Sequence, residues 1–260
     1  MKLKWYGTAS ILLEKEGTQL LFDPFLSLNG TTFKPSIDDF AAVKNIFVTH
    51  GHLDHIIDIP LIAERGGNKA TVYCTATPYK VLTSKGVANE QIHKIAPGDV
   101  LNIGSFEVRV LKGKHIEFNK GLILKTILNP RVLAYRDNLM FISRENKVCI
   151  EAGETVVFDI YSSQEHILLL GSLNLDEHTE YPTGVDLLIL PLQGRSDISR
   201  YAIPFIDRLL PKKVLLDHFD DTFPPISSAV DTGSFVKLLA EKHPSITVIS
   251  TRAGNEWINI

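Results

Sequence analysis

One short stretch of the chain concentrates side chains that bind metal ions. It holds three of the nine histidines and an aspartate within six residues: His50, His52, Asp54 and His55. Imidazole nitrogens and carboxylate oxygens bind divalent ions at about 2.0–2.2 Å, and Gly51 allows the backbone to turn between them. A polar turn with Asp54 as a helix cap would explain the aspartate but not the histidines. The pattern therefore predicts that His50 and His52 point at one metal position, and Asp54 and His55 at another.

A strand and a helix flank this stretch. Lys44–Thr49 has the length and apolar character of a buried strand, and Ile56–Glu64 carries apolar residues at helical spacing before Gly66 and Gly67. A loop held at both ends can aim several side chains at one point. We therefore expect the four side chains to converge beside the end of a strand.

Short strands are predicted throughout the chain. The strands are expected at Leu3–Tyr6, Ser10–Glu14, Gln19–Phe22, Lys44–Thr49, Thr71–Cys74, Val100–Ile103, Ser105–Leu111, Asn138–Ser143, Lys147–Ile150, Glu154–Ile160, His166–Leu170, Val185–Pro191, Lys213–Leu216, Ile246–Ser250 and Glu256–Ile260. Helices or amphipathic segments are expected at Ile56–Glu64, Thr77–Lys85, Ser199–Leu210 and Gly233–Lys242. No linker rich in Gly, Ser or Pro divides the halves. The pattern indicates two mixed sheets facing each other with helices outside, in a single layered domain over residues 1–260.

The composition excludes several classes of protein. The 260 residues include 27 Lys and Arg against 30 Asp and Glu, which gives a net charge of −3 and argues against nucleic acid as a partner. No apolar stretch approaches the roughly 20 residues of a membrane span, and the N-terminus lacks the features of a signal peptide. We expect a cytoplasmic protein without a membrane partner. Cys74 and Cys149 lie in apolar segments and are expected to be buried thiols.

The pattern His-x-His-x-Asp-His after a buried strand resembles that of the metallo-β-lactamase superfamily. The segments 7–14 (Gly-Thr-Ala-Ser-Ile-Leu-Leu-Glu) and 20–24 (Leu-Leu-Phe-Asp-Pro) look like the opening meander and Asp-Pro turn of that superfamily. The chain looks most like its UlaG-like metal-dependent hydrolases. The resemblance implies an α+β fold, a four-layer αβ/βα sandwich of two mixed sheets with outer helices and with metals at one edge between the sheets.

The resemblance also implies two further metal ligands. His115 follows a strand and resembles the third histidine of the first metal, and His218 ends a late strand and resembles the last histidine of the second. One ion would then be bound by His50, His52 and His115, and the other by Asp54, His55 and His218. The expected cofactor is Zn²⁺, one or two ions per chain, with Mn²⁺ and Fe²⁺ as alternatives. Asp54 would also be catalytic, because it can orient a hydroxide and receive its proton.

Ser172 departs from the family pattern. The family usually places a metal-bridging aspartate in a Gly-Asp turn after the strand corresponding to His166–Leu170, where this chain has Gly171 and Ser172. A neutral hydroxyl is a poor ligand for a divalent ion. Either the second metal binds weakly, or a water fills the gap, or Asp176 supplies the carboxylate from four residues further on. We favour a water or a weakly bound metal over Asp176.

Two more polar side chains have two interpretations each. Asp23 either shapes the Asp-Pro turn or accepts the free ring N–H of a ligand histidine. Arg195 follows the strand Val185–Pro191, and the implied fold places it at the same edge as His218. It either contacts an anionic substrate there or is an exposed structural residue.

These residues predict a metal-dependent hydrolase. Two ions would lower the pKa of a shared water from about 16 to about 7 and present hydroxide to a small ester, phosphodiester, lactone or amide. Without a bridging carboxylate the centre keeps a charge of roughly +2, which favours an anionic small-molecule substrate. The alternatives are a metal-binding module whose catalysis has lapsed with Ser172 and an RNA-processing nuclease, disfavoured by the absence of a basic patch. A homo-oligomer is also expected. Substrate specificity is expected to depend on the loops Asn29–Asp39, Asn119–Asn138 and Thr222–Ser228.

Overall fold

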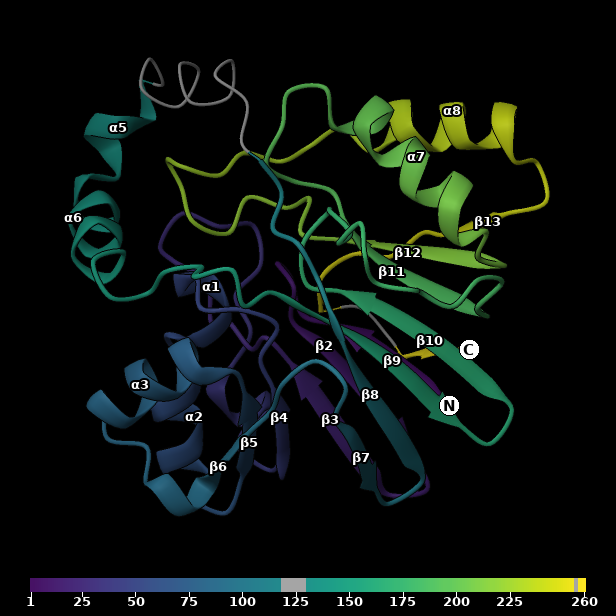
Figure 1. Ribbon diagram of the computed structural model, residues 1–260. Helices are drawn as coiled ribbons and strands as arrows, with labels where there is room; N and C mark the ends of the chain where they lie inside the picture. The colour runs from purple at the N-terminus through teal and green to yellow at the C-terminus, as the bar shows by residue number, and fades with distance from the viewer. Residues whose placement is uncertain (118–129, 255–256) are drawn as a thin grey trace.

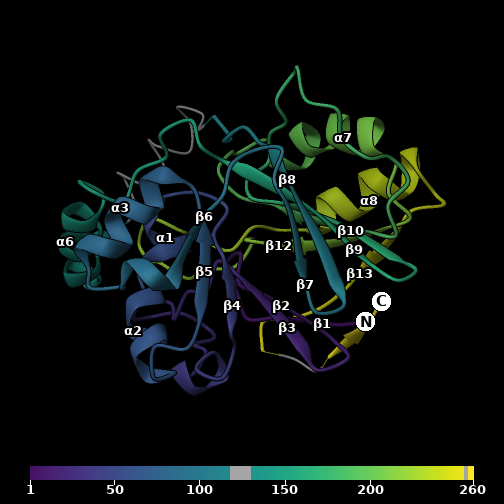
Figure 2. The same cartoon turned by 60° about the horizontal axis from the view of Figure 1, so that its bottom comes forward.

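Two seven-stranded β-sheets lie face to face, with helices on the outer side of each (Figure 1, Figure 2). The computed structural model describes residues 1–117, 130–254 and 257–260. Both sheets contain antiparallel and parallel pairs. The α+β class and the arrangement of two mixed sheets with outer helices are thus confirmed. In the described part of the chain no helix combines the length and the apolar character that crossing a membrane requires.

The first sheet contains most of the N-terminal strands. In spatial order they are β14 (Ile258–Asn259), β1 (Lys2–Trp5), β2 (Ile11–Lys15), β3 (Thr18–Phe22), β4 (Asn45–Phe47), β5 (Thr71–Cys74) and β6 (Ile92–Lys94). The pairs from β14 to β3 are antiparallel, and those from β3 to β6 are parallel. On its outer face this sheet packs against α1 (Leu53–Ile56), α2 (Ile59–Arg65) and α3 (Ala76–Ser84).

The second sheet repeats this plan with the later strands. In spatial order they are β13 (Thr247–Ile249), β12 (Lys213–Asp217), β11 (Leu187–Pro191), β10 (Glu165–Leu170), β9 (Val156–Ser162), β8 (Phe106–Lys112) and β7 (Val100–Ile103). Its outer face packs against α7 (Ile198–Leu209) and α8 (Gly233–Lys242). The remaining helices are α5 (Arg131–Ala134), α6 (Arg136–Glu145) and the short 3₁₀ turns η1 (Ile37–Asp39) and η2 (Asn89–Gln91).

Alternation along the strands sends side chains into different cores. In β2, Leu13 lies between the two sheets whereas Leu12 packs under the helices of the first sheet. Between the sheets the rings of Phe22, Phe47 and Phe158 meet with centroids 5.1–5.4 Å apart. Truncation of one such buried ring costs about 3–5 kcal/mol. The apolar core therefore contributes strongly to holding the two sheets together.

The strand predictions at Asn138–Ser143 and Lys147–Ile150 are wrong. Residues 136–145 form α6, and the four residues from 147 to 150, all of them described, form no strand. The buried members of α6 are Asn138, Ile142 and Glu145, which recur at helical spacing. A short apolar run inside this helix imitates a strand, an ambiguity that periodicity alone does not resolve.

Further differences from the predicted boundaries concern the helix after the histidine loop and the last strand. The helix expected at Ile56–Glu64 starts earlier and is divided into α1 and α2, with Pro60 in the first turn of α2. Asp54 and His55 consequently lie on α1 and not on a loop. The last strand was expected to begin at Glu256, which lies outside the described residues, and β14 covers Ile258–Asn259.

Candidate metal centre

Four strand ends bring the candidate ligands to one edge of the two sheets. The loop with His50 follows β4 of the first sheet, whereas His115, Ser172 and His218 follow β8, β10 and β12 of the second. All four residues line one cavity of about 290 Å³. Chain segments more than 160 residues apart thus contribute to a single site, as the sequence predicts.

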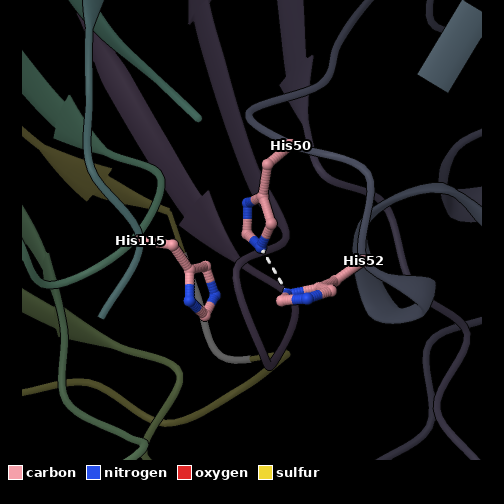
Figure 3. Close-up of side chains that lie close together, drawn as sticks. All are labelled: His50, His52 and His115. Atoms are coloured by element: carbon pink, nitrogen blue, oxygen red, sulfur yellow. Dashed lines mark hydrogen bonds between the residues drawn. The ribbon is translucent and has the colours of Figure 1, made fainter. Parts of the chain in front are cut away.

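Three histidines form the first group. The ring nitrogens of His50, His52 and His115 lie within 4.8 Å of one another. The ring of His115 lies 4.6 Å from that of His52 and 5.0 Å from that of His50, measured between centroids. Figure 3 shows the three rings turned toward a common space. The structure therefore brings His115 to the two histidines of the loop.

Asp54, His55 and His218 form the second group, again with their candidate ligand atoms within 4.8 Å of one another. Asp54 Oδ2 lies 3.0 Å from His218 Nε2 and 3.6 Å from His55 Nε2. The rings of His50 and His55 lie only 3.9 Å apart between centroids, so the two groups are adjacent. Both sets named from the sequence are assembled as predicted, and that they bind metal stays a prediction.

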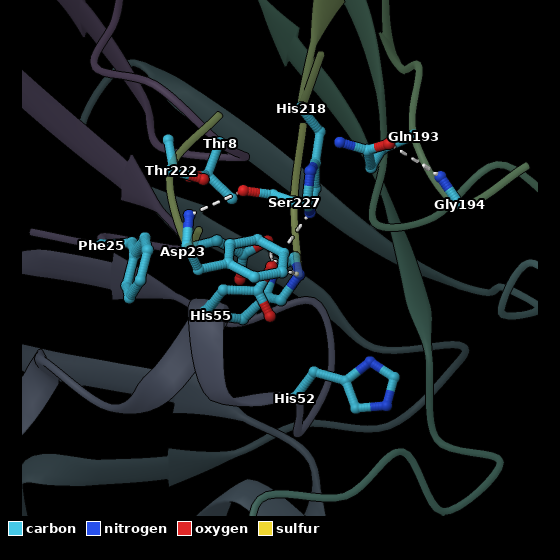
Figure 4. A network of polar contacts seen from close by, with 12 residues as sticks. Thr8, Asp23, Phe25, His52, His55, Gln193, Gly194, His218, Thr222 and Ser227 are labelled. Atoms are coloured by element: carbon cyan, nitrogen blue, oxygen red, sulfur yellow. Dashed lines mark hydrogen bonds and ion pairs between the residues drawn. The ribbon is translucent and has the colours of Figure 1, made fainter. Parts of the chain in front are cut away.

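Asp23 holds the second group in place from behind. Its fully buried carboxylate accepts hydrogen bonds from the backbone N–H and the hydroxyl of Thr49, at 2.8 and 2.6 Å, and lies 2.8 Å from His55 Nδ1. Asp23 and His55 lie next to each other in Figure 4, and this contact leaves His55 Nε2 3.6 Å from Asp54 Oδ2. Asp23 also has a left-handed backbone, with φ of 44°, at the Asp-Pro turn. Asp23 therefore both shapes the turn and contacts the ring of His55, and that His55 is a metal ligand stays a prediction.

The opening turn of the chain fixes His218. The carbonyl of Thr8 accepts the backbone N–H of His218 and the indole N–H of Trp5, each at 2.8 Å. The backbone N–H of Thr8 donates to the carboxylate of Asp220 at 3.0 Å. His218 itself has a left-handed backbone, with φ of 54°. These bonds from the first sheet hold the end of β12 in a conformation that L-residues rarely adopt.

The histidines of the first group are neutral at pH 7. Burial lowers the pKa of His50 well below its ordinary value of 6.5, and burial lowers that of His52 to about 4. Burial also lowers the pKa of His115. Neutral imidazole is the form that binds a metal ion. The donor chemistry of this group thus fits a divalent ion.

The second group carries more charge. Burial alone would lower the pKa of His55, but Asp23 and Asp54 outweigh it and raise the value to about 9. Burial is likewise outweighed at His218, whose pKa the Asp54 carboxylate raises. At Asp54 burial acts in the opposite direction, and the two histidines still hold its pKa well below the ordinary value. A metal ion entering here must displace protons from the imidazoles.

Ser172 and Asp176 have separate partners. The buried hydroxyl of Ser172 accepts the backbone N–H of Ile116 at 3.0 Å, next to His115. The carboxylate of Asp176 lies 2.8 Å from Lys112 Nζ and belongs to neither ligand group. Asp176 therefore does not take the place of the bridging carboxylate in this structure. That a water occupies the position of the bridging carboxylate, or that the second metal is weakly held, stays a prediction.

Arg195 lies outside the cavity. Its guanidinium is paired with Asp197, with Nε 2.8 Å from Oδ1, and packs 4.4 Å from the ring centre of Tyr201. Arg195 is not among the residues that line the cavity, although its neighbour Gly194 is. Direct substrate contact by Arg195 stays a prediction to which this geometry gives no support.

The loops expected to set specificity contribute unequally. From Thr222–Ser228 the residues Phe223, Ile226, Ser227 and Ser228 line the cavity, whereas Asn29–Asp39 contributes none. In the loop Asn119–Asn138, residues 119–129 lie outside the described residues, and the rest do not line the cavity. Helix α6 contributes Ile142 instead, a residue missed because its segment has the pattern of a strand.

Asp217 is a further buried carboxylate beside the site that sequence analysis did not select. It is 1% exposed, and its Oδ1 has no hydrogen-bond partner among the described residues. Burial raises its pKa to about 8. The buried Nδ1 of the adjacent His218 is likewise unpaired within the described structure. In the sequence, residues 216–218 (Leu-Asp-His) indicate only the end of a strand. The burial of Asp217 depends on how β12 packs against its neighbours, and local sequence does not show this.

Comparison with known proteins agrees with this geometry. Residues 18–127 match the family described as Beta-lactamase superfamily domain. A UPF0173 metal-dependent hydrolase of Carboxydothermus hydrogenoformans is 30% identical over 237 residues, which cover 90% of each chain.

Two solved structures share the fold over the whole chain. Igni18, a metallo hydrolase from the archaeon Ignicoccus hospitalis, has a TM-score of 0.64 at 19% identity and is covered over 98% of its length. An isothiocyanate hydrolase from Delia radicum gut bacteria has a TM-score of 0.63 at 13% identity and is covered over 99%. The identity and coverage of the first relative, together with this shared fold, show that the chain belongs to the UPF0173 metal-dependent hydrolases of the metallo-β-lactamase superfamily.

Proposed function

We propose that the two ligand groups bind two divalent ions, with Zn²⁺ as the expected metal and Mn²⁺ or Fe²⁺ as alternatives, and that the protein hydrolyses a small ester, lactone, amide or phosphodiester. One observation carries the proposal. Two adjacent groups, each of three candidate ligand atoms within 4.8 Å of one another, open into the same cavity. Their members are His50, His52, His115, Asp54, His55 and His218.

The residues of the site have different roles in the proposed reaction. Bound ions would acidify a water and polarise the bond under attack. Asp54 is the only carboxylate that lines the cavity within the described residues, so it takes the proton of the attacking water. Asp23 keeps His55 Nδ1 engaged, and the Ser172 hydroxyl holds the backbone beside His115. These contacts fix the ligands before a substrate arrives, which reduces the reorganisation needed for catalysis.

Ser172 supports a second candidate function, a metal-binding module without turnover. Replacement of a bridging carboxylate by a hydroxyl leaves two neighbouring ions without a shared negative charge. The RNA-processing alternative has less support, because among the described residues no Lys or Arg lines the cavity. Turnover by the metal-loaded protein separates hydrolysis from a lapsed site.

The test combines metal analysis with hydrolysis. Zn²⁺-loaded protein is dialysed, its metal content is measured by plasma mass spectrometry, and hydrolysis of phenyl esters, lactones, anilides and bis-p-nitrophenyl phosphate is followed. His52→Ala should lose metal and activity together, whereas His178→Ala, at an exposed histidine of a surface turn, should lose neither. Equal metal content in both variants would refute the ligand assignment. Full metal content without turnover on any substrate would favour the lapsed module.

A further inference from the structure

The cavity beside the two ligand groups has a largely apolar wall. Its volume of about 290 Å³ is at the lower end of the range for small-molecule sites. Carbon surface comes from α1, from α6 and from the segments that follow β8, β10 and β12: Leu53, Ile116, Ile142, Leu173, Phe223 and Ile226. Contact with such a wall releases water from an apolar group and favours its binding.

The described part of the wall offers no Lys or Arg to a charged ligand. Two arginines of neighbouring segments are paired elsewhere: Arg131 Nη2 lies 2.6 Å from Asp221, and Arg195 Nε lies 2.8 Å from Asp197. A carboxylate or phosphate placed against this wall would lose its hydration without gaining an ion pair, which is costly.

Two polar side chains of the wall, Ser227 and Gln193, are already hydrogen-bonded within the protein. The hydroxyl of Ser227 donates to Asp221 at 2.6 Å and accepts the backbone N–H of Phe223 at 2.9 Å. The amide of Gln193 donates to the carbonyl of Ser228 and accepts the backbone N–H of the next residue (Figure 4). A ligand would have to break these bonds to use the groups. The wall therefore favours apolar groups of a ligand.

We propose that the substrate is a small carbonyl compound, an ester, lactone or amide, whose reacting group lies at the two ligand groups and whose acyl part is short, uncharged and apolar. This inference rests on the proposed function and narrows it. Among the described residues that line the cavity, every imidazole and carboxylate belongs to one of the two ligand groups. A substrate can therefore carry negative charge at its reacting group, because the charge of about +2 inferred for the metal centre favours it there. The acyl part, which faces the wall, should carry no charge.

A matched pair of metal-binding probes tests the proposal without requiring turnover. Hydroxamates bind active-site metals, and 4-methylpentanohydroxamic acid differs from succinic monohydroxamic acid only by an isopropyl group in place of a carboxylate of similar shape. Titration calorimetry on the Zn²⁺-loaded protein should give at least tenfold tighter binding for the isopropyl compound. Equal or tighter binding of the carboxylate compound would overturn the proposal, as would failure of both compounds to bind.

A charge placed in the wall should change this preference. Ile226 is 36% exposed at the cavity, so the side chain of Ile226→Arg can reach solvent without unfolding the loop. The variant should bind succinic monohydroxamic acid at least fivefold more tightly than the parent protein does. Val236→Arg on α8 is a matched control, because Val236 is 38% exposed and does not line the cavity, and its affinities should equal those of the parent. Equal gains in both variants would refute a role of the wall.

The two proposals fail in different ways. Selective binding of the isopropyl hydroxamate without hydrolysis of any ester, lactone or amide would refute the proposed hydrolysis and leave the inference about the wall intact. Hydrolysis that proceeds equally with 4-methylpentanoyl and succinyl phenyl esters would leave the proposed function intact and refute the inference.

Discussion

Asp23→Asn should weaken both the fold and the candidate metal centre. The carboxylate of Asp23 is fully buried and accepts from two donors of Thr49 and from Nδ1 of His55, all within 2.8 Å. An asparagine of the same shape keeps one acceptor oxygen and turns an NH₂ group toward buried donors. At least one of these donors then loses its partner, and His55 loses the negative charge that it faces.

The magnitude follows from these contacts. An unpaired buried donor costs about 1–3 kcal/mol, and removal of one member of a buried ion pair costs about 3–5 kcal/mol. These costs do not add, because the contacts share one carboxylate. We expect Asp23→Asn to lower the free energy of unfolding by about 3–5 kcal/mol in total. For a chain of this size that corresponds to a fall in melting temperature of roughly 6–20 °C.

Thermal melts of the metal-free variant at pH 7, with metal analysis of the Zn²⁺-loaded variant, measure both effects. Asp159→Asn is the control, because Asp159 is buried and lies 2.6 Å from His166 Nε2 in β10, away from the cavity. Both variants should lose stability, but only Asp23→Asn should lose metal. A change below about 1 kcal/mol in Asp23→Asn, with unchanged metal content, would refute the role assigned to this carboxylate.

Three further substitutions test other parts of the structure. Ser172→Asp should raise the metal content after dialysis against a mild chelator from nearer one ion to nearer two, and no rise would show that another group already fills the bridging role. Gly51→Ala should lower metal content with little loss of helix signal in circular dichroism, because a Cβ there would lie 2.3 Å from the carbonyl oxygen of Ile150 and would push the ligand loop away. Glu165→Gln should cost up to about 1 kcal/mol at neutral pH. Bonds from Lys15 and the terminal amine lower the pKa of Glu165 from 4.5 to about 2, so its contribution is present above pH 4.5 and is lost as the pH falls through 2. Urea melts should therefore show the two proteins converging at low pH, and a constant difference would contradict this.

The sequence predicts the ligands better than their surroundings. His50, His52, Asp54 and His55 are close in the chain, so their convergence requires only a local turn. His218 is paired with Asp54 across 164 positions, and only the resemblance to a known superfamily connected the two segments in advance. Local spacing is therefore sufficient for the loop but not for the complete centre.

The cavity wall was harder to predict, for a physical reason. Ile142 reaches the cavity because α6 is a helix, and its short apolar run has the same local pattern as a strand. The hydrogen bonds that the backbone N–H groups of His218 and Ile116 donate to Thr8 and Ser172, respectively, join segments far apart in the chain. The periodicity of apolar residues does not predict such contacts, because they depend on how the two sheets pack.

Anomalous X-ray diffraction at the zinc edge, on crystals of the Zn²⁺-loaded protein, tests the central claim most directly. We predict two anomalous peaks about 3.5–4 Å apart. One should lie within bonding distance of His50, His52 and His115, and the weaker one within bonding distance of Asp54, His55 and His218. Zinc bound only at other positions, or an absence of anomalous density between these six side chains in fully loaded protein, would contradict the account.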